Sequence, residues 1–217
     1  MQELALWALP VLAAVVFHEV AHGWAARRLG DDTAWRAGRL TLNPLAHADP
    51  VGTVVLPLLL LATGAPFVFG YARPVPVEPA NFRKPRRDFA LVALAGPAAN
   101  LLLAGACGLA LHGAGALPLA ATGHMPRLLA QNLHLTALMA TNGVLINVAL
   151  AVFNLIPIPP LDGGRVAVGV LPRRAARRLA RLEPFGMAIT VALIMTGVLG
   201  RVMGPAAYGL ARVLLPA

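Results

Sequence analysis

The sequence contains a single cysteine, Cys107, among its 217 residues. One cysteine excludes an internal disulfide and any zinc cluster that is built from cysteine ligands. Charged residues are also scarce, at 12% of the chain, whereas 58% of the residues are hydrophobic and the mean hydropathy is +0.71. This composition is typical of a membrane protein and untypical of a soluble one.

Acidic residues are rare: the chain has nine of them against 18 lysines and arginines, which gives a net charge of +9. The basic residues cluster at 27–39, 83–87 and 173–181, in the segments that flank the apolar runs. We therefore interpret them as signals of membrane topology that place these segments in the cytoplasm. The expected environment is a lipid bilayer, and no nucleic-acid partner is expected.

Residues 4–26 are almost all apolar, and this run is about as long as a bilayer-spanning helix requires. It is interrupted by His18, Glu19 and His22, and ionisable residues at membrane depth usually mark function because they are costly to bury. The three residues form an H-E-x-x-H pattern, in which both imidazoles lie on one face of a helix and can bind one zinc ion. Glu19 would then be placed to accept a proton from water bound to that ion.

The other apolar runs predict further membrane segments and, with the first, a single α-helical polytopic membrane domain over residues 1–217. We expect a bundle of about four to six membrane segments, because runs of this length cross or enter a bilayer. The predicted elements are spans at 4–26, 89–111 and 133–156, a re-entrant element within 51–75, and a C-terminal membrane segment at 185–215 that Gly204-Pro205 separates from a shorter tail. Residues 4–170 would form the core, and residues 113–128 would form an outward-facing loop.

The segment 51–75 lies between two basic clusters that are both expected in the cytoplasm, so it would enter the membrane and return on the same side. Its apolar run at 51–62 is short and contains Pro57, which fits a re-entrant element; a hairpin of the kind found in soluble proteins is the alternative. The alternating residues Pro74-Val75-Pro76-Val77 predict a small β-hairpin-like edge, because proline within sheets is confined to edge strands.

Catalytic zinc takes three protein ligands and keeps one position for water, so a third ligand must join the two histidines. Asp162 is the best candidate, because it follows a helix broken by prolines, where freed backbone can line a cavity. Gly163 and Gly164 would let the chain pass close to the metal. The alternative for Asp162 is a helix cap beside these glycines.

Taken together, three motifs resemble the site-2 protease family of intramembrane zinc metalloproteases. They are His18-Glu19-x-x-His22, Gly96-Pro97-x-x-Asn100 and Asn154-x-x-Pro157-x-Pro159-x-Leu161-Asp162-Gly163-Gly164. The segments 38–50 and 70–77 resemble the compact prokaryotic branch of that family. Unlike the larger members, the sequence shows no PDZ-like insertion between the spans and no CBS-like tail.

The resemblance implies that His18, His22 and Asp162 bind one zinc ion per chain, and that Glu19 is the general base of peptide-bond hydrolysis. It also implies a multi-pass protein of the cell membrane, with its active site toward the cytoplasmic side and with transmembrane proteins as substrates. Asn154 would hold the substrate backbone or the developing oxyanion, and Asn147, two turns away on the same helical face, could join it. Hydrogen bonding between helices is the alternative for both asparagines.

Several alternatives stay open at this point. His47 and Asp49 could be extra metal ligands in an inhibited state, or they could cap a loop. Asn100 is expected to be a packing residue, and the extended segment 71–77 could pair with an unwound substrate or only brace the bundle. The rival functions are a proteolytically inactive relative that binds transmembrane helices and a transporter of zinc or another ion.

Overall fold

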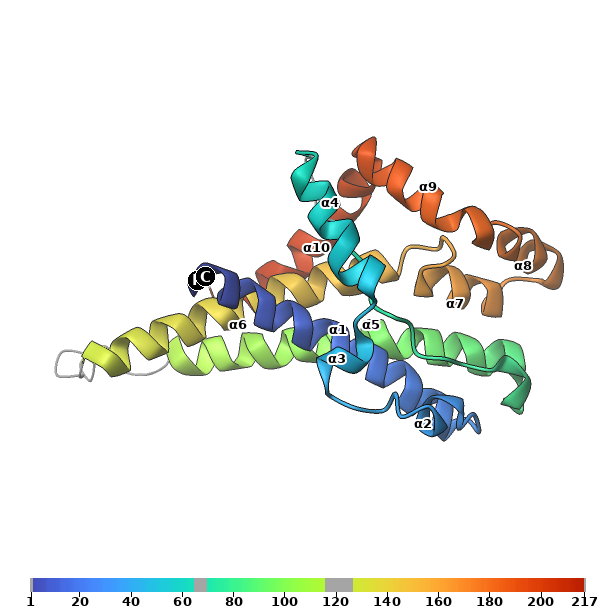
Figure 1. Cartoon of the computed structure of the whole chain (residues 1–217), viewed down its shortest axis with the longest axis horizontal. Helices are drawn as coiled ribbons and strands as arrows, with labels where there is room; N and C mark the ends of the chain where they lie inside the picture. Colours follow the sequence, from blue (N-terminus) through green and yellow to red (C-terminus); the bar gives the residue numbers. More distant parts are fainter. Residues whose placement is uncertain (1, 65–69, 116–126, 217) are drawn as a thin grey trace.

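The computed structural model describes residues 2–64, 70–115 and 127–216, and the regular secondary structure in this part of the chain is all helical, without a β-strand. Figure 1 shows three long helices, α1, α5 and α6, that lie against one another and form the body of the molecule. The helices are α1 (Gln2–Arg28), α2 (Thr33–Arg36), α3 (Pro44–His47), η1 (Pro50–Val55), α4 (Leu56–Ala62), η2 (Pro79–Asn81), α5 (Pro85–Gly115), α6 (Arg127–Asn154), α7 (Asp162–Val170), α8 (Arg173–Ala180), α9 (Glu183–Met195) and α10 (Val198–Leu214).

The three long helices contain the apolar stretches that can cross a membrane, at Leu6–Arg28, Pro85–Gly113 and Ala130–Asn154. The bent pair α9 and α10 raises the number of candidate spans in the described residues to four if the pair counts as one. These elements confirm the polytopic helical class that the hydropathy predicts. Most of the expected outward loop at 113–128 lies outside the described residues.

The C-terminal region breaks at a different place from the one that the sequence predicts. We expected Gly204-Pro205 to end the membrane segment, but Pro205 lies inside α10, and the helix axis turns by 79° between α9 and α10. The turn falls at Gly197, whose φ of 70° belongs to the left-handed region that glycine adopts without steric penalty. Beyond the turn, α10 packs back against α6 and α5.

Small residues let the long helices approach one another closely. Ala104 of α5 and Val144 and Val148 of α6 are almost completely buried, and Leu111 completes this core. Helices in a lipid environment gain little from the hydrophobic effect, so close contact between small and branched side chains carries the association.

The predicted re-entrant segment begins with a continuous helix, η1 and α4, whose large apolar side chains point outward. Val55, Leu58 and Leu61 are each more than half exposed, which suits contact with lipid. The chain then returns to its starting point: the Tyr71 amide donates to the Gly52 carbonyl at 3.1 Å, and the Thr53 hydroxyl donates to the Tyr71 carbonyl at 3.0 Å. An excursion that leaves and returns at one place is expected of both alternatives, the re-entrant element and the hairpin.

The predicted β-hairpin-like edge at 74–77 is wrong, because residues 70–78 belong to no strand in the part of the chain that the structure describes. Pro74 and Pro76 have no N–H group, and a strand needs donors on a regular spacing. Three of the remaining amides donate outside any ladder: Arg73 to the carbonyl of His47 at 2.9 Å, Val75 to the Glu19 carboxylate at 2.9 Å, and Glu78 to the Asp31 carboxylate at 2.8 Å.

Asp31 connects the end of α1 to this extended segment. Its side chain is completely buried and accepts hydrogen bonds from Thr33, from the Glu78 amide and from the Asn81 side chain. Burial acts to raise the pKa of Asp31, but the hydrogen bonds from Thr33, Asn81 and Glu78 outweigh it and hold the pKa below its ordinary value. The ionised carboxylate therefore stabilises the fold.

We expect Asp31→Asn to lower the free energy of unfolding by about 2–3 kcal/mol at neutral pH, because hydrogen bonds to a charged acceptor are lost. The folded-state pKa is lowered, so this stability is present above the ordinary carboxyl pKa of about 4 and disappears as the pH falls below it. Thermal unfolding in detergent at pH 7 and pH 3 measures the effect. The gap between wild type and variant should be narrower at pH 3 than at pH 7, because the contribution is lost as the pH falls toward and through the lowered folded-state pKa.

The neighbouring Asp32 provides the control for this prediction. Its carboxylate is 43% exposed and lies 3.7 Å from Arg27 and 4.0 Å from Arg36. Exposed pairs of this kind contribute about 0–1 kcal/mol, so Asp32→Asn should change stability little at either pH. An equal loss in both variants, or an Asp31→Asn effect that is as large at pH 3 as at pH 7, would contradict the assignment.

Candidate active site

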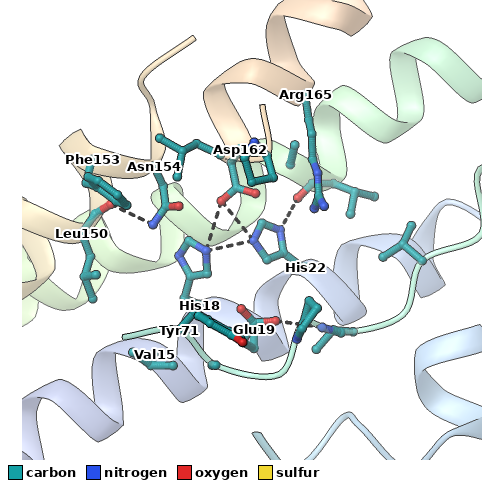
Figure 2. A pocket seen from close by; sticks show the side chains of 18 of the residues that line it. Val15, His18, Glu19, His22, Tyr71, Leu150, Phe153, Asn154, Asp162 and Arg165 are labelled. Atoms are coloured by element: carbon teal, nitrogen blue, oxygen red, sulfur yellow. Dashed lines mark hydrogen bonds and ion pairs between the residues drawn. The ribbon is translucent and has the colours of Figure 1, made fainter. Parts of the chain in front are cut away.

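A cavity of about 380 Å³ lies between α1, the start of α7 and the extended segment that follows α4. His18, Glu19 and His22 reach it from α1, and Asp162 reaches it from α7 (Figure 2). The rest of its wall is largely apolar, with contributions from α5, the end of α6 and α9. The cavity therefore brings together residues that are more than 140 positions apart in the sequence.

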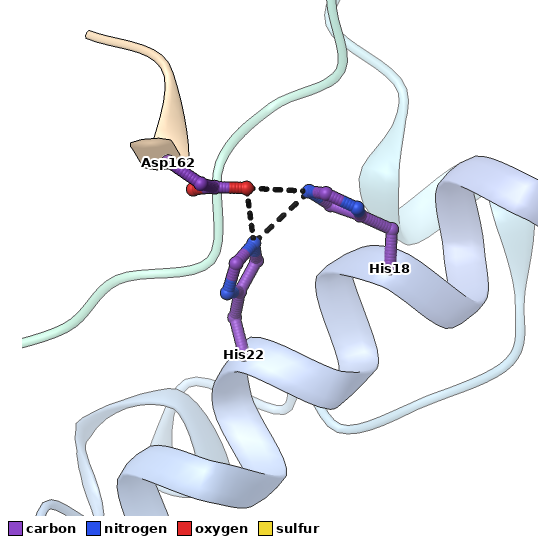
Figure 3. A group of neighbouring side chains, drawn as sticks. All are labelled: His18, His22 and Asp162. Atoms are coloured by element: carbon purple, nitrogen blue, oxygen red, sulfur yellow. Dashed lines mark hydrogen bonds and ion pairs between the residues drawn. The ribbon is translucent and has the colours of Figure 1, made fainter. Parts of the chain in front are cut away.

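His18, His22 and Asp162 point their electron-pair donors at one place (Figure 3). The Nε2 atoms of the histidines are 3.0 Å apart, and the Asp162 Oδ2 lies 3.1 Å and 3.2 Å from them. A tetrahedral zinc ion with bonds of about 2.0–2.1 Å separates its ligand atoms by about 3.3 Å. The spacing, the burial of all three residues and the donor types fit zinc.

The outer nitrogens of both imidazoles are held by acceptors. His18 Nδ1 lies 2.7 Å from the Asn100 side-chain oxygen, and His22 Nδ1 lies 2.7 Å from the Val92 carbonyl. An oxygen of this kind only accepts, so both Nδ1 atoms carry a proton, and in the neutral imidazole Nε2 is then the nitrogen with the lone pair. This is the tautomer in which histidine binds a metal through Nε2.

Helix α5 can approach these imidazoles because Gly96 has no side chain. A Cβ atom at Gly96 would collide with the rings of His18 and His22. One turn further along, the Asn100 amide donates to the Ala14 carbonyl at 3.1 Å and to the Asn147 side chain at 2.8 Å. The Gly96-Pro97-x-x-Asn100 motif thus supplies both the space and the hydrogen-bond partner for the first histidine.

Asp162 is held at the start of α7 by a close crossing of the chain over itself. Cβ atoms at Gly163 and Gly164 would collide with the backbone at 155–159, so only glycine allows this path. At the other end of α7, Arg86 of α5 donates to the Val168 and Leu171 carbonyls. Both ends of α7 are therefore fixed, and the Asp162 carboxylate faces the two histidines.

Glu19 lies on the cavity wall next to the first histidine, and its carboxylate is tied to the extended segment. Its Oε2 atom accepts the Val75 backbone N–H at 2.9 Å. No other hydrogen bond to this carboxylate is present among the described residues. One carboxylate oxygen is thus oriented by the backbone, and the other accepts no hydrogen bond from the described residues.

The two candidate asparagines occupy different positions. Asn154 lies on the cavity wall, where its amide donates to the Leu150 carbonyl at 3.1 Å. Asn147 is 3% exposed and lies behind His18, where it accepts from Asn100 and donates to the Gly143 carbonyl. Its amide is thus part of a hydrogen-bond network between helices, while Asn154 is the one that a substrate in the cavity can reach.

His47 and Asp49 brace the loop before η1. The Nε2 of His47 lies 2.8 Å from the Thr41 carbonyl, and the Asp49 carboxylate accepts the first two amides of η1, from Val51 and Gly52. In the part of the chain that the structure describes, the group that could hold a metal ion is His18, His22 and Asp162. The geometry favours the loop-capping alternative for both residues.

The sequence does not predict two residues that hydrogen-bond to the candidate site, Asn100 and Val75. Asn100 was expected to be a packing residue, yet it hydrogen-bonds to a candidate metal ligand. The available signal was an amide side chain inside an apolar span, four residues after a glycine. Val75 acts through its backbone N–H, which no side-chain pattern reveals.

The apolar helices and this cavity define a class: a polytopic helical membrane protein with an H-E-x-x-H metal-type site on a membrane-length helix. The family model described as "Peptidase family M50" matches residues 119–197, which include Asn154 and Asp162. The chain is 36% identical over 197 residues to "Putative zinc metalloprotease YwhC" of Bacillus subtilis (strain 168), over 91% of this chain and 83% of that protein.

A second relative, "Putative zinc metalloprotease Rip2" of Mycolicibacterium smegmatis (strain ATCC 700084 / mc(2)155), is 33% identical over 190 residues, which are 88% of this chain and 66% of that protein. No solved structure matches the chain. The chain belongs to peptidase family M50, the site-2 protease family. This membership confirms the resemblance to that family which the three sequence motifs indicate.

We expect the purified protein to bind one zinc ion, and His22→Ala to lose it, because two ligands no longer complete the set. Asn100→Ala should keep the three ligands but weaken zinc affinity about 10–100-fold, as loss of a hydrogen bond to a ligating histidine does. Metal analysis and competition with a chelator measure both effects.

Asn142→Ala is the matched control for this series, because Asn142 is also an amide in a long helix but donates to the Leu6 carbonyl, away from the cavity. It should bind zinc as the wild type does. Full zinc occupancy in His22→Ala would contradict the ligand assignment, and unchanged affinity in Asn100→Ala would contradict the supporting role.

Proposed function

We propose that this chain is a zinc-dependent intramembrane endopeptidase that hydrolyses peptide bonds of transmembrane proteins. The observation that carries the proposal is the convergence of His18, His22 and Asp162 beside Glu19, in a cavity walled by membrane-length helices. Both named relatives are described as zinc metalloproteases, which supports the same chemistry. Zinc, when bound, supplies a Lewis acid that makes water a nucleophile at neutral pH and polarises a carbonyl group.

Glu19 supplies the base in this proposal. Its carboxylate accepts the proton of the attacking water and then delivers that proton to the leaving amine. The Val75 N–H holds Oε2, so the carboxylate keeps one orientation during both transfers. A base that is already oriented loses little conformational freedom when the reaction begins.

Asn154 supplies a neutral donor on the wall of the same cavity. Its amide donates to the Leu150 carbonyl in this structure, and a substrate carbonyl could take the place of that acceptor. A donor without charge stabilises negative charge that develops on oxygen and does not compete for the metal.

A transmembrane substrate must unwind before its backbone can react, because a helix pairs all its carbonyl groups internally. The segment 70–77 lines the cavity in an extended form and could lie along the unwound backbone. Only some of its N–H groups can bond to a substrate, because Pro74 and Pro76 have none and the Val75 N–H donates to Glu19. We therefore propose a short contact with the substrate and not a full strand.

The proposed location of the site is toward the cytoplasmic side of the membrane. Arg27 and Arg28, at the end of α1, line one surface cavity together with Arg83 and Arg87, so two of the basic clusters lie on one side of the bundle. Excess basic charge next to membrane spans favours the cytoplasmic side. Glu19 and His22 lie in the second half of α1, the half that ends at this side with Arg27 and Arg28.

We expect Glu19→Gln to bind zinc normally and to reduce proteolysis at least about 100-fold, because the amide keeps the size of the side chain but accepts no proton. Zinc content, thermal unfolding and cleavage of a reconstituted transmembrane substrate are measured together. Glu183→Gln, an exposed residue in the first turn of α9, is the control and should cleave normally. Turnover by Glu19→Gln near the wild-type rate would mean that another group is the base.

Val75→Pro tests the orientation of Glu19, because it removes the N–H that Oε2 accepts and leaves the carboxylate in place. We expect kcat to fall about 10–100-fold with zinc content unchanged, the effect of losing one hydrogen bond to a charged group. Val75→Ala keeps the N–H and serves as the control. Equal kcat values in the two variants would show that the Val75 amide does not orient the base.

A further inference from the structure

The catalytic cavity contains one arginine, Arg165, that the proposed chemistry does not use. It lies one turn after Asp162 on α7, and it is the only lysine or arginine among the residues that line the cavity. Figure 2 shows its side chain extending from α7 toward the side of the cavity where His22 lies. Asn154 lies on the other side of the three candidate ligands in the same view.

The Arg165 guanidinium lacks a counter-ion in the described part of the chain. Its Nε is buried and makes no hydrogen bond, and none of the ion pairs of the described residues includes it. The ring centre of Phe89 lies 5.7 Å from its guanidinium carbon. A cation in a largely apolar cavity is stable only if a partner of opposite charge or a set of acceptors reaches it.

The carboxylates of the cavity do not pair with Arg165. Asp162 faces the two histidines, and none of the ion pairs of the described residues joins Glu19 to Arg165. A guanidinium presents donors in a planar fork that matches a carboxylate, and such pairs are the strongest hydrogen-bonded partners of arginine. The free donor on Arg165 therefore fits a carboxylate that arrives with the ligand.

We propose that Arg165 is a specificity-determining residue that binds an acidic side chain of the substrate; this rests on the proposed endopeptidase function. The acidic residue lies on the flank of the scissile bond nearer the C-terminal end of α1, because Arg165 lies on that side of the candidate ligands. Three residues of helix rise by about 4.5 Å, and an extended chain advances about 3.3 Å per residue, so the acid lies about one to two residues from the cleaved bond.

The test uses the full-length protein, reconstituted with zinc, and synthetic transmembrane peptides with a helix-breaking Asn-Pro pair. Each peptide carries one Glu, Gln or Lys at the first, second or third position from the cleavage site, on the side that would lie nearer the C-terminal end of α1. We expect the wild type to cleave the best Glu peptide with about tenfold higher kcat/KM than its Gln counterpart. The Gln peptide loses one hydrogen-bonded ion pair with Arg165, and a loss of this kind has about that effect.

In Arg165→Gln this preference should disappear, and in Arg165→Glu it should reverse in favour of the Lys peptide. Arg165→Lys keeps the charge without the planar fork and should retain part of the preference. Arg178→Gln, an exposed arginine on α8, is the control and should keep the full preference. Reversal by charge exchange is a result that a purely structural role of Arg165 would not produce.

A parallel binding measurement separates this inference from the proposed function. Glu19→Gln protein is titrated with fluorescent Glu and Gln peptides, and tighter binding of the Glu peptide that depends on Arg165 supports the inference even if no peptide is cleaved. Equal binding and equal cleavage of Glu and Gln peptides by the wild type would overturn it. If the wild type binds zinc but cleaves no peptide while the Glu preference in binding remains, the endopeptidase function fails and Arg165 recognition stands.

Discussion

The Nε2 atoms of His18 and His22 and the Oδ2 of Asp162 lie 3.0–3.2 Å from one another inside an apolar bundle. Lone pairs at this separation repel one another unless a cation lies between them, and a buried carboxylate is costly without a positive partner. Nearby features follow from this constraint. Gly96 leaves room for the imidazoles, Asn100 and the Val92 carbonyl hold their outer nitrogens, and glycines after Asp162 allow its approach.

The extended segment after α4 links the metal-type site to the rest of the molecule through its backbone amides. Residues 73, 75 and 78 donate to His47 of α3, to Glu19 of α1 and to Asp31 in the loop between α1 and α2. Prolines between these positions keep the chain extended and prevent it from pairing as an ordinary strand. One segment can therefore hold the candidate base, close the loop before η1 and fasten the end of α1.

The cavity is chemically asymmetric along its length. One end offers the neutral amide of Asn154, the centre holds the three candidate ligands with Glu19, and the other end holds the cation of Arg165 (Figure 2). An extended peptide that crosses such a cavity meets a different partner at each part of its backbone or side chains. The asymmetry would therefore set both the direction and the register of a bound substrate.

The sequence by itself determined the helical membrane class, the three long apolar helices and the identity of His18, Glu19, His22 and Asp162 as one candidate site. These follow from hydropathy and from short motifs, because the length of an apolar run and the spacing of residues on one helix are local properties. The return of the chain at residue 71 after the excursion from residue 53 is common to both alternatives for the segment 51–75, the re-entrant element and the hairpin.

Only the tertiary structure decided the rest. Asn100 is recognisable as the partner of His18 only after α5 packs on α1, and Asn147 is turned toward Asn100 instead of the cavity by the same packing. The extended segment near Val75 forms no β-edge, because its amides bond to side chains and carbonyls that are distant in sequence. The turn at Gly197 replaced the expected break at Pro205. Each outcome depends on which distant groups meet, and periodicity along one chain carries no information about that.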